Sequence, residues 1–337
     1  MRLSNIKETQ KKSITVGFFY EANKERLHLT PLAGEEGYYR EIVDKNLHRP
    51  GLALAGYVRL FTFNRVQIFG NTEMKYLQQL TEEERLKSLE TFFQFDLPCI
   101  IITNNNPVYE ELTRLAVERK VPVFLSPLET TTLTYYLSDF LDDQFARQCV
   151  IHGSFVDVYG IGLMLIGRSG IGKSEIALDL IERGHRLVAD DVVTVTRKGE
   201  GILMGAGTDL VKHFMEIRGL GLIDVRSMFG VRAIRYQKRV EVVVELMEWR
   251  PDEEYTRTGL DDETSTLLDV SLPWVKLPIF PGKNVTVICE VIALNYLLKH
   301  YGYDSAVEFS KRLETVLAQK SKHIGDRVIN YFEHDYE

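Results

Sequence analysis

The sequence has no run of about 20 consecutive apolar residues, which is the length that a membrane-spanning helix needs. Residues 1–13 are polar and charged, whereas a secretory signal carries a long apolar stretch at that place. We therefore expect a protein that is neither exported by such a signal nor inserted in a membrane. Internal repeats and low-complexity segments are also missing, so the organisation of the chain is read from its hydrophobic periodicity.

Cysteine is scarce and positive charge is in deficit. The three cysteines are odd in number and widely spaced, without the close pairs of a zinc site or a disulfide framework: Cys99, Cys149 and Cys289. This usage favours a reducing cytoplasm. The formal net charge of -7 argues against broad binding to nucleic acid or to an anionic membrane.

The chain is long enough for two domains. Its 337 residues exceed the usual domain size of ~100–200 residues. Hydrophobic residues make up 45% and charged residues 26%, as in an ordinary globular protein. A polar stretch at 142–144 follows a helical pattern, and we place the domain boundary there, which gives domains 1–145 and 146–337.

The first half alternates apolar runs with helical patterns. A capping box of Thr81 and Glu84 predicts the start of a helix that ends near residue 93. The strand, helix and strand over 99–125 form a βαβ unit, which builds parallel sheets covered by helices. We expect strands at 14–20, 52–58, 66–70, 99–103 and 121–125, and further helices at 108–120 and 130–141.

The second half also reads as α/β. Strands are expected at 154–159 and 163–166, and a helix over 173–183 is expected to stop at Gly184. The remaining predictions are strands at 187–189, 192–195 and 240–246 and helices at 285–299 and 305–317. The fold class is therefore a small N-terminal α/β domain and a larger C-terminal α/β domain.

A glycine-rich loop lies between the strand at 163–166 and the helix at 173–183. It matches G-x-x-x-x-G-K-[ST], in which backbone N–H groups and the helix N-terminus surround phosphates. The lysine adds a positive charge for the β/γ-phosphates, and the serine hydroxyl is placed for Mg²⁺. We predict an ATP site formed by Gly167, Arg168, Ser169, Gly170, Ile171, Gly172, Lys173 and Ser174.

Two carboxylates follow the next apolar run, at Asp190 and Asp191. In an α/β sheet this position lies close to the phosphate loop. A carboxylate there can hold Mg²⁺ through water or take a proton from an acceptor hydroxyl. Alone, the pair is equally well explained as a solvated turn, but beside the loop a functional role is the better interpretation.

Four other features carry no claim by themselves. His152 is typical of a structural histidine, and Arg257 of an exposed charge. The segment 215–224, with Glu216 and Arg218, can be a turn that enters a helix, and 278–284 reads as a plain turn.

Together, however, the order and spacing of these features resemble the bacterial HPr kinase/phosphorylase family. The N-terminal half matches more loosely, best at 48–52 and 126–140. The stretches that carry the resemblance are 152–153, 156–160, 170–175, 183–191, 216–221 and Pro281-Gly282.

The resemblance implies a bifunctional enzyme. It would phosphorylate a serine of the phosphocarrier protein HPr with ATP, sometimes with pyrophosphate, and reverse this by attack of inorganic phosphate on phosphoserine. It also implies a homohexamer and a C-terminal domain of the phosphoenolpyruvate-carboxykinase type. Asp191 would be the base in one direction and the acid in the other. His152, Lys173 and Arg257 would complete the catalytic set, with Ser174 and Glu216 on the metal.

Two departures from the family pattern bear on the reverse reaction and on the loop. Phe280 and Lys283 stand where the family carries arginines, so phosphorolysis is expected to be weaker than the kinase reaction. Arg168 adds a charge beside the phosphates. Two alternatives are a kinase of this architecture that acts on another protein or small-molecule hydroxyl, and an ATP-switched regulator without catalysis. For the N-terminal domain we predict a role in assembly or sensing.

Overall fold

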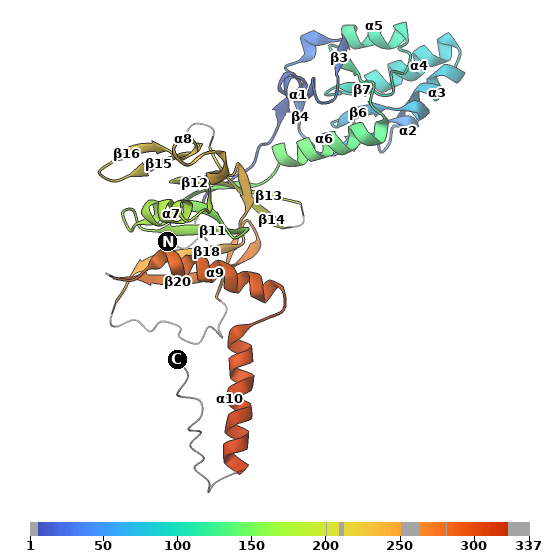
Figure 1. Ribbon diagram of the computed structural model, residues 1–337. Helices are drawn as coiled ribbons and strands as arrows, with labels where there is room; N and C mark the ends of the chain where they lie inside the picture. Colours follow the sequence, from blue (N-terminus) through green and yellow to red (C-terminus); the bar gives the residue numbers. More distant parts are fainter. Residues whose placement is uncertain (1–5, 200, 209–211, 251–262, 281, 323–337) are drawn as a thin grey trace. The chain divides into compact units, whose positions relative to one another are not determined.

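The computed structural model describes residues 6–199, 201–208, 212–250, 263–280 and 282–322 (Figure 1). The chain divides into two compact units. The N-terminal unit holds Glu8–Gln148 together with 198–200, and the C-terminal unit holds the rest of the chain, from Cys149 onward with residues 1–7.

The N-terminal unit is built on a sheet in the order β3-β8-β7-β6-β5. The last four strands in this order are parallel, and β3 is antiparallel to β8. The strands are β3 (Thr30–Ala33), β5 (Leu47–His48), β6 (Val66–Phe69), β7 (Ile100–Ile102) and β8 (Val123–Leu125). The main helices are α1 (Val16–Asn23), α3 (Asn71–Gln79), α4 (Glu82–Phe93), α5 (Glu110–Glu118) and α6 (Thr130–Gln144).

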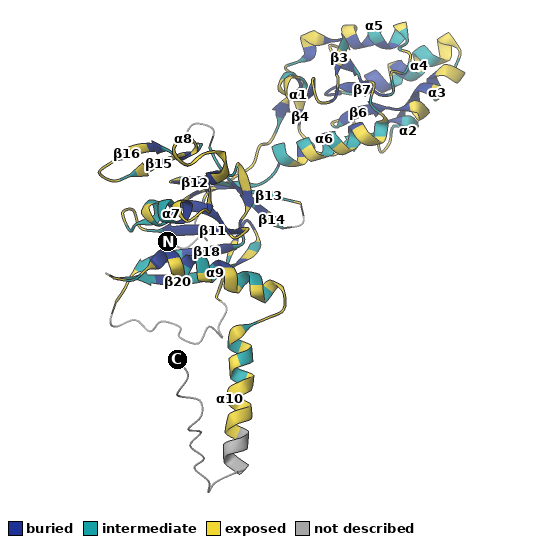
Figure 2. Ribbon diagram, viewed as in Figure 1, coloured by how far each residue is buried: buried dark blue, intermediate teal, exposed yellow. Residues whose placement is uncertain are grey.

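Alternation along the strands explains why both faces of this sheet are covered. Ile100 and Ile102 pack with apolar residues of α3, α4 and α5, whereas Ile101 packs with those of α1 and α6. Figure 2 shows the strands buried between the helices. The predicted βαβ unit is confirmed as β7, α5 and the parallel strand β8.

Two predicted strands in this unit are wrong. Only Ile14 and Thr15 of 14–20 are extended, and α1 begins at Val16. The Thr15 side chain accepts a hydrogen bond from Phe18 N and caps this helix, and Val16, Phe19 and Asn23 face inward at helical spacing. The predicted strand 52–58 is replaced by the short helix α2 (Gly51–Leu54) and turns. In both, the aromatic or aliphatic character suggested a strand, and burial of one helical face decided otherwise.

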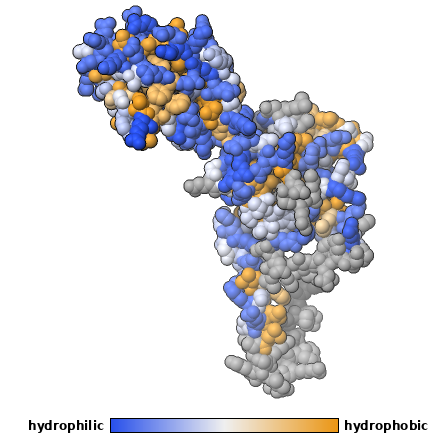
Figure 3. All heavy atoms as spheres, turned by 180° about the vertical axis from the view of Figure 1, so that it is seen from behind, coloured by the Kyte–Doolittle hydropathy of each residue, from blue (hydrophilic) through white to orange (hydrophobic). Residues whose placement is uncertain are grey.

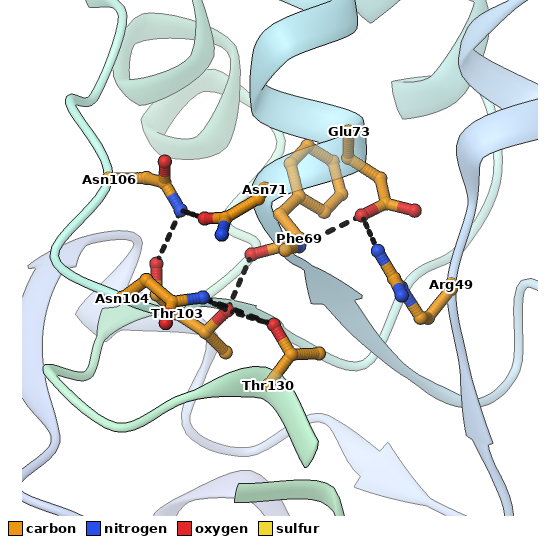
Figure 4. Close-up of polar contacts among 9 residues, drawn as sticks. Arg49, Phe69, Asn71, Glu73, Thr103, Asn104, Asn106 and Thr130 are labelled. Carbon is orange, nitrogen blue, oxygen red and sulfur yellow. Dashed lines mark hydrogen bonds and ion pairs between the residues drawn. The ribbon is translucent and has the colours of Figure 1, made fainter.

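A polar network closes the sheet edge where β6 and β7 end (Figure 4). Glu73 of α3 accepts from Gly70 N at 2.9 Å and pairs with Arg49 at 2.7 Å. The hydroxyl groups of Thr103 and Thr130 lie 2.7 Å apart, which ties the end of β7 to the start of α6. These contacts satisfy polar groups at the ends of buried elements and fix the helices to the sheet.

The C-terminal unit contains a mixed sheet in the order β12-β10-β11-β18-β20-β19. β11, β18 and β20 are parallel, while β10 is antiparallel to both of its neighbours. β10 therefore separates the strand that leads into the glycine loop from the strand that leads to Asp190. The strands are β10 (Ser154–Val158), β11 (Ile161–Gly167), β12 (Arg186–Ala189), β18 (Val242–Glu248), β19 (Thr264–Leu267) and β20 (Val270–Ile279).

Helices cover one face of this sheet and a second sheet covers the other. The helices α7 (Lys173–Glu182) and α9 (Val285–His300) pack on the first face, around a core that includes Leu165, Leu180 and Cys289. Phe155 and Met164 face the second sheet. Its strands run in the order β9 (Gln148–His152), β13 (Val192–Lys198), β14 (Ile202–Gly207) and β17 (Gln237–Arg239).

Three further elements complete the unit. A hairpin of β15 (Phe214–Ile217) and β16 (Gly221–Asp224) precedes the helix α8 (Val225–Phe229), where the sequence suggested a turn alone before a helix. The helix α10 (Ser305–Lys322) exposes Val307, Phe309 and Leu313, and hydrophobic and hydrophilic surface alternate along it (Figure 3). Among the described helices, none combines the length and the apolar character that crossing a bilayer requires.

Candidate active site

The glycine loop leads from the end of β11 into the first turn of α7. Gly172 occupies the N-cap position of α7 with a φ of +102°, a left-handed conformation that residues with a Cβ rarely adopt. The first N–H groups of α7 have no partner in the helix itself. The predicted strand, loop and helix are confirmed, and they present the N-terminus of α7 as a site for an anion.

Lys173 folds back over the loop. Its Nζ atom donates to the carbonyl oxygens of Gly167 and Arg168 at 3.2 and 3.1 Å. The Arg168 side chain forms an ion pair with Glu248 at the end of β18, so its added charge is balanced by a carboxylate. The ammonium group of Lys173 is therefore the positive charge that the loop itself holds in place.

A buried chain of hydroxyl and carboxylate groups lies beside the loop. Ser174 Oγ donates to both carboxylate oxygens of Asp190, at 3.1 and 2.9 Å, and Ser154 Oγ donates to Asp190 Oδ1 at 2.5 Å. Burial raises the pKa of Asp190, and the two hydroxyl groups oppose that shift. Asp190 thus fixes the hydroxyl of Ser174, a function that the sequence did not separate from that of Asp191.

Asp191 has a different environment from its neighbour. It is exposed and has a φ of +62°, so the chain turns sharply between β12 and β13. Its carbonyl oxygen accepts from Gly153 N at 3.1 Å, which brings the end of β9 and the exposed His152 beside it. Gly153 lies so close to β11 that a Cβ there would be 2.4 Å from the carbonyl oxygen of Leu165. The backbone therefore holds His152 and Asp191 at the same corner.

The β15–β16 hairpin adds two charged side chains. Glu216 is exposed on β15, and β15 packs against α7. Arg218 follows at the turn, and its guanidinium group lies over the loop, because a Cβ on Gly170 would be 2.5 Å from Arg218 Nη1. Arg218 was not predicted as a site residue. The only signal was its place in a glycine-rich turn, and no local pattern shows that this turn reaches the loop.

The remaining predicted residues are not brought to this site. Arg257 and Pro281 lie outside the described residues. Lys283 Nζ donates to the carbonyl oxygen of Pro278 at 3.0 Å and lies 5.3 Å from the centre of the Phe280 ring. The two departures from the family pattern therefore contact each other. Within the described ranges, no cluster of three or more His, Cys, Asp or Glu residues is placed to hold a metal ion.

Comparisons with known proteins cover nearly the whole chain. The family description "HPr Serine kinase C-terminal domain" matches residues 143–313, and "HPr Serine kinase N terminus" matches residues 14–141. The HPr kinase/phosphorylase of Chloroherpeton thalassium is 55% identical over 335 residues, and that of Prosthecochloris aestuarii is 51% identical over 334 residues; both alignments cover 98% of each chain. A solved HPr(Ser) kinase/phosphatase from Coxiella burnetii is 32% identical, with a TM-score of 0.43, and covers 48% of this chain and 97% of that one.

Proposed function

This chain belongs to the HPr kinase/phosphorylase family, and from that premise we propose that it transfers a phosphoryl group from ATP to a serine of HPr and reverses the transfer with inorganic phosphate. The observation that supports this proposal best is the arrangement around α7. A glycine loop with a folded-back lysine lies beside the buried pair of Ser174 and Asp190, and the exposed Asp191 follows directly.

The loop would bind the ATP phosphates through its N–H groups and the N-terminus of α7. Lys173 would exchange its two carbonyl contacts for the β/γ-phosphates, since a charged acceptor forms the stronger hydrogen bond. Arg218, over Gly170, would add a guanidinium fork from the opposite side. The nucleotide would thus be held between α7 and the β15–β16 hairpin.

Ser174 and Glu216 would hold Mg²⁺, because hydroxyl and carboxylate oxygens are the ligands that it prefers. When bound, the ion would neutralise charge on the phosphates. Asp190 would position the Ser174 hydroxyl from behind, through the hydrogen bonds at 2.9 and 3.1 Å. Pyrophosphate would use the same groups, since it offers the same oxygens as a nucleotide tail.

Asp191 would act as the base of the forward reaction. It would accept the proton of the HPr serine as that oxygen bonds to the γ-phosphorus and the bond to ADP breaks. In reverse, protonated Asp191 would return the proton to the leaving serine while inorganic phosphate takes the phosphoryl group and forms pyrophosphate. His152 at the same corner, Lys173, and Arg257 by family resemblance would stabilise the transferring group.

We expect the reverse reaction to be the slower one. Phosphoserine and phosphate are anions that a guanidinium group grips with two parallel hydrogen bonds. Lys283 offers a single ammonium group, which already donates to Pro278, and Phe280 offers no donor. The alternative kinase and the ATP-switched regulator remain as competing functions for the experiment below to reject.

The test is a phosphotransfer assay with the full chain, HPr and Mg²⁺, run with ATP forward and with inorganic phosphate on phosphoserine-HPr in reverse. Asp191→Asn should lose both reactions by more than about 100-fold and still bind ATP. Asp139→Asn, an exposed aspartate on α6, serves as the control and should keep both. Turnover on another hydroxyl without phosphoserine on HPr would favour the other kinase. ATP-dependent assembly without any phosphotransfer would favour the regulator.

Assembly into a homohexamer and work in the cytoplasm are further parts of the proposal. An exposed apolar stripe at helical spacing along α9 supports a contact with another copy: Val287, Val291, Leu294 and Leu298. The buried thiols of Cys99 and Cys289 suit a reducing compartment. Light scattering on the purified chain tests the hexamer, and a monomer at all concentrations would reject it.

A further inference from the structure

A pocket of about 370 Å³ lies at the C-terminal end of α7. Six side chains line it, those of Asp157, Tyr159, Arg183, His185, Arg186 and Arg235. Since α7 has 10 residues, its far end is about 15 Å from the glycine loop. The pocket is therefore separate from the proposed nucleotide site.

Guanidinium groups dominate the wall of this pocket, and one of them is unpaired. Arg235 pairs with Asp157 at 2.6 Å, and Arg183 is shared between Glu290 at 3.3 Å and Asp179 at 3.6 Å. Arg186 is exposed and forms no hydrogen bond or ion pair with the described residues. An anion would therefore find one uncompensated cation, with two further guanidinium groups beside it.

Asp157 supplies a second and independent observation. Its side chain is buried, and its Oδ1 atom has no hydrogen-bond partner among the described residues, while Oδ2 is taken by Arg235. A buried acceptor without a partner is costly. A carboxylate oxygen is satisfied only by a donor, so the occupant of the pocket must carry a hydroxyl or an ammonium group.

The other walls are rigid and do not repel an anion. The His185 ring lies 4.7 Å from the Tyr159 ring and has Nε2 3.0 Å from Glu290 Oε1, so contacts on two sides hold it. At the end of α7, Gly184 N donates to the Ile181 carbonyl at 2.9 Å and His185 N to the Leu180 carbonyl at 3.1 Å. These two bonds cap carbonyl oxygens that would otherwise present partial negative charge at this end.

A purely structural charge cluster accounts for only part of this arrangement. Such a cluster pairs its members, as Arg235 does with one oxygen of Asp157. It leaves the Arg186 guanidinium and the second Asp157 oxygen unexplained, and both belong to the same cavity.

We propose that this pocket binds a small phosphate ester that also carries a free hydroxyl group. The guanidinium groups of Arg186, Arg183 and Arg235 hold the phosphate, since three such groups suit a dianion better than a single carboxylate. The hydroxyl donates to Asp157 Oδ1. This site goes beyond the proposed function and does not depend on it.

The experiment measures binding of radiolabelled glycerol phosphate to the full chain by equilibrium dialysis, with Mg-ADP saturating the nucleotide site. Saturable binding to one site per chain is expected, and inorganic phosphate should bind more weakly. Arg186→Gln should weaken glycerol phosphate binding about 10-fold or more, the loss expected for one charged hydrogen-bond donor. Arg312→Gln on α10 removes the same charge from an exposed position and should change nothing.

Asp157→Asn tests the hydroxyl contact separately. It should abolish the preference for glycerol phosphate over inorganic phosphate, while inorganic phosphate binds at least as well because a negative charge is gone. The proposal is overturned if glycerol phosphate does not bind saturably, if Arg186→Gln leaves its binding unchanged, or if Mg-ADP competes it away. Should Asp157→Asn fail to fold, the result with Arg186→Gln still decides the matter, because Arg186 is exposed and has no partner to lose.

Discussion

Asp190 and Asp191 are adjacent in the chain and chemically different. The first is buried and accepts from two serine hydroxyls, whereas the second is exposed at a sharp turn. The sequence predicted that a carboxylate works beside the loop and selected Asp191 by family resemblance. It did not predict the role of Asp190, because two identical side chains differ only in which way the backbone turns them.

The pH dependence of stability should report the burial of Asp190. Its pKa is raised in the folded protein, chiefly by burial, so its contribution to stability is complete below the unfolded pKa and is lost as the pH rises through the folded one. Asp190→Asn has no such loss. Urea denaturation at several pH values from about 4 to 7 should show the variant gaining stability relative to the parent as the pH rises. A constant difference would contradict the assigned cause.

Arg218 is the residue whose role depends most on tertiary structure. Its guanidinium lies over Gly170, from a hairpin about 50 residues further along the chain. If it stabilises the transferring phosphoryl group, Arg218→Ala should lower kcat by on the order of 100-fold. The steady-state kinase assay measures this, with Arg226→Ala on the adjacent α8 as the control for charge. Equal effects of the two variants would argue against a specific role.

Elements whose signals are local were predicted well. The helix α7 follows from its loop and its Gly184 stop, and α4 from its capping box at Thr81. By contrast, 14–20 was predicted as a strand although α1 forms there, because its aromatic residues suit both states and only burial against the sheet selects one. The β15–β16 hairpin escaped prediction because a short strand has too few residues to show a period.

The capping box of α4 offers a test at this level. Thr81 Oγ1 accepts from Glu84 N at 3.3 Å, and Glu84 returns the contact by accepting from Thr81 N at 3.0 Å. Thr81→Ala removes the first of these bonds and should lower the free energy of unfolding of the N-terminal unit by about 1 kcal/mol. Urea denaturation measures the change. Thr81→Ser keeps the hydroxyl and should cost far less, and a similar loss for both would exclude capping as the reason.

Across the molecule, the two units place unlike demands on the sequence. The residues around the glycine loop form motifs that a single chain reveals, whereas the N-terminal sheet is an ordinary α/β layer without a catalytic cluster that we identify. The fold class of both units was predicted from periodicity, because helices and strands were correctly placed along most of the chain. Which copies of the chain meet, and where, is not encoded by any local pattern.

Deletion of residues 1–145 separates assembly from catalysis. We expect the remaining 146–337 to keep ATP binding, since the glycine loop, Ser174 and Asp190 all lie in the C-terminal unit. Its oligomeric state or its regulation should differ from that of the full chain. Light scattering and nucleotide titration measure the two properties. An unchanged oligomer with unchanged regulation would remove assembly and sensing from the N-terminal unit.

Gly153 shows how an absent side chain can set a catalytic distance. The corner that carries His152 approaches β11 so closely that even a methyl group would strike the Leu165 carbonyl oxygen. Alanine at this position would act as a wedge, forcing the corner outward from the strand that supports the glycine loop. Spacing between the proton-handling residues and the nucleotide is thus calibrated by empty volume, and an otherwise mild substitution would detune it without removing any functional group.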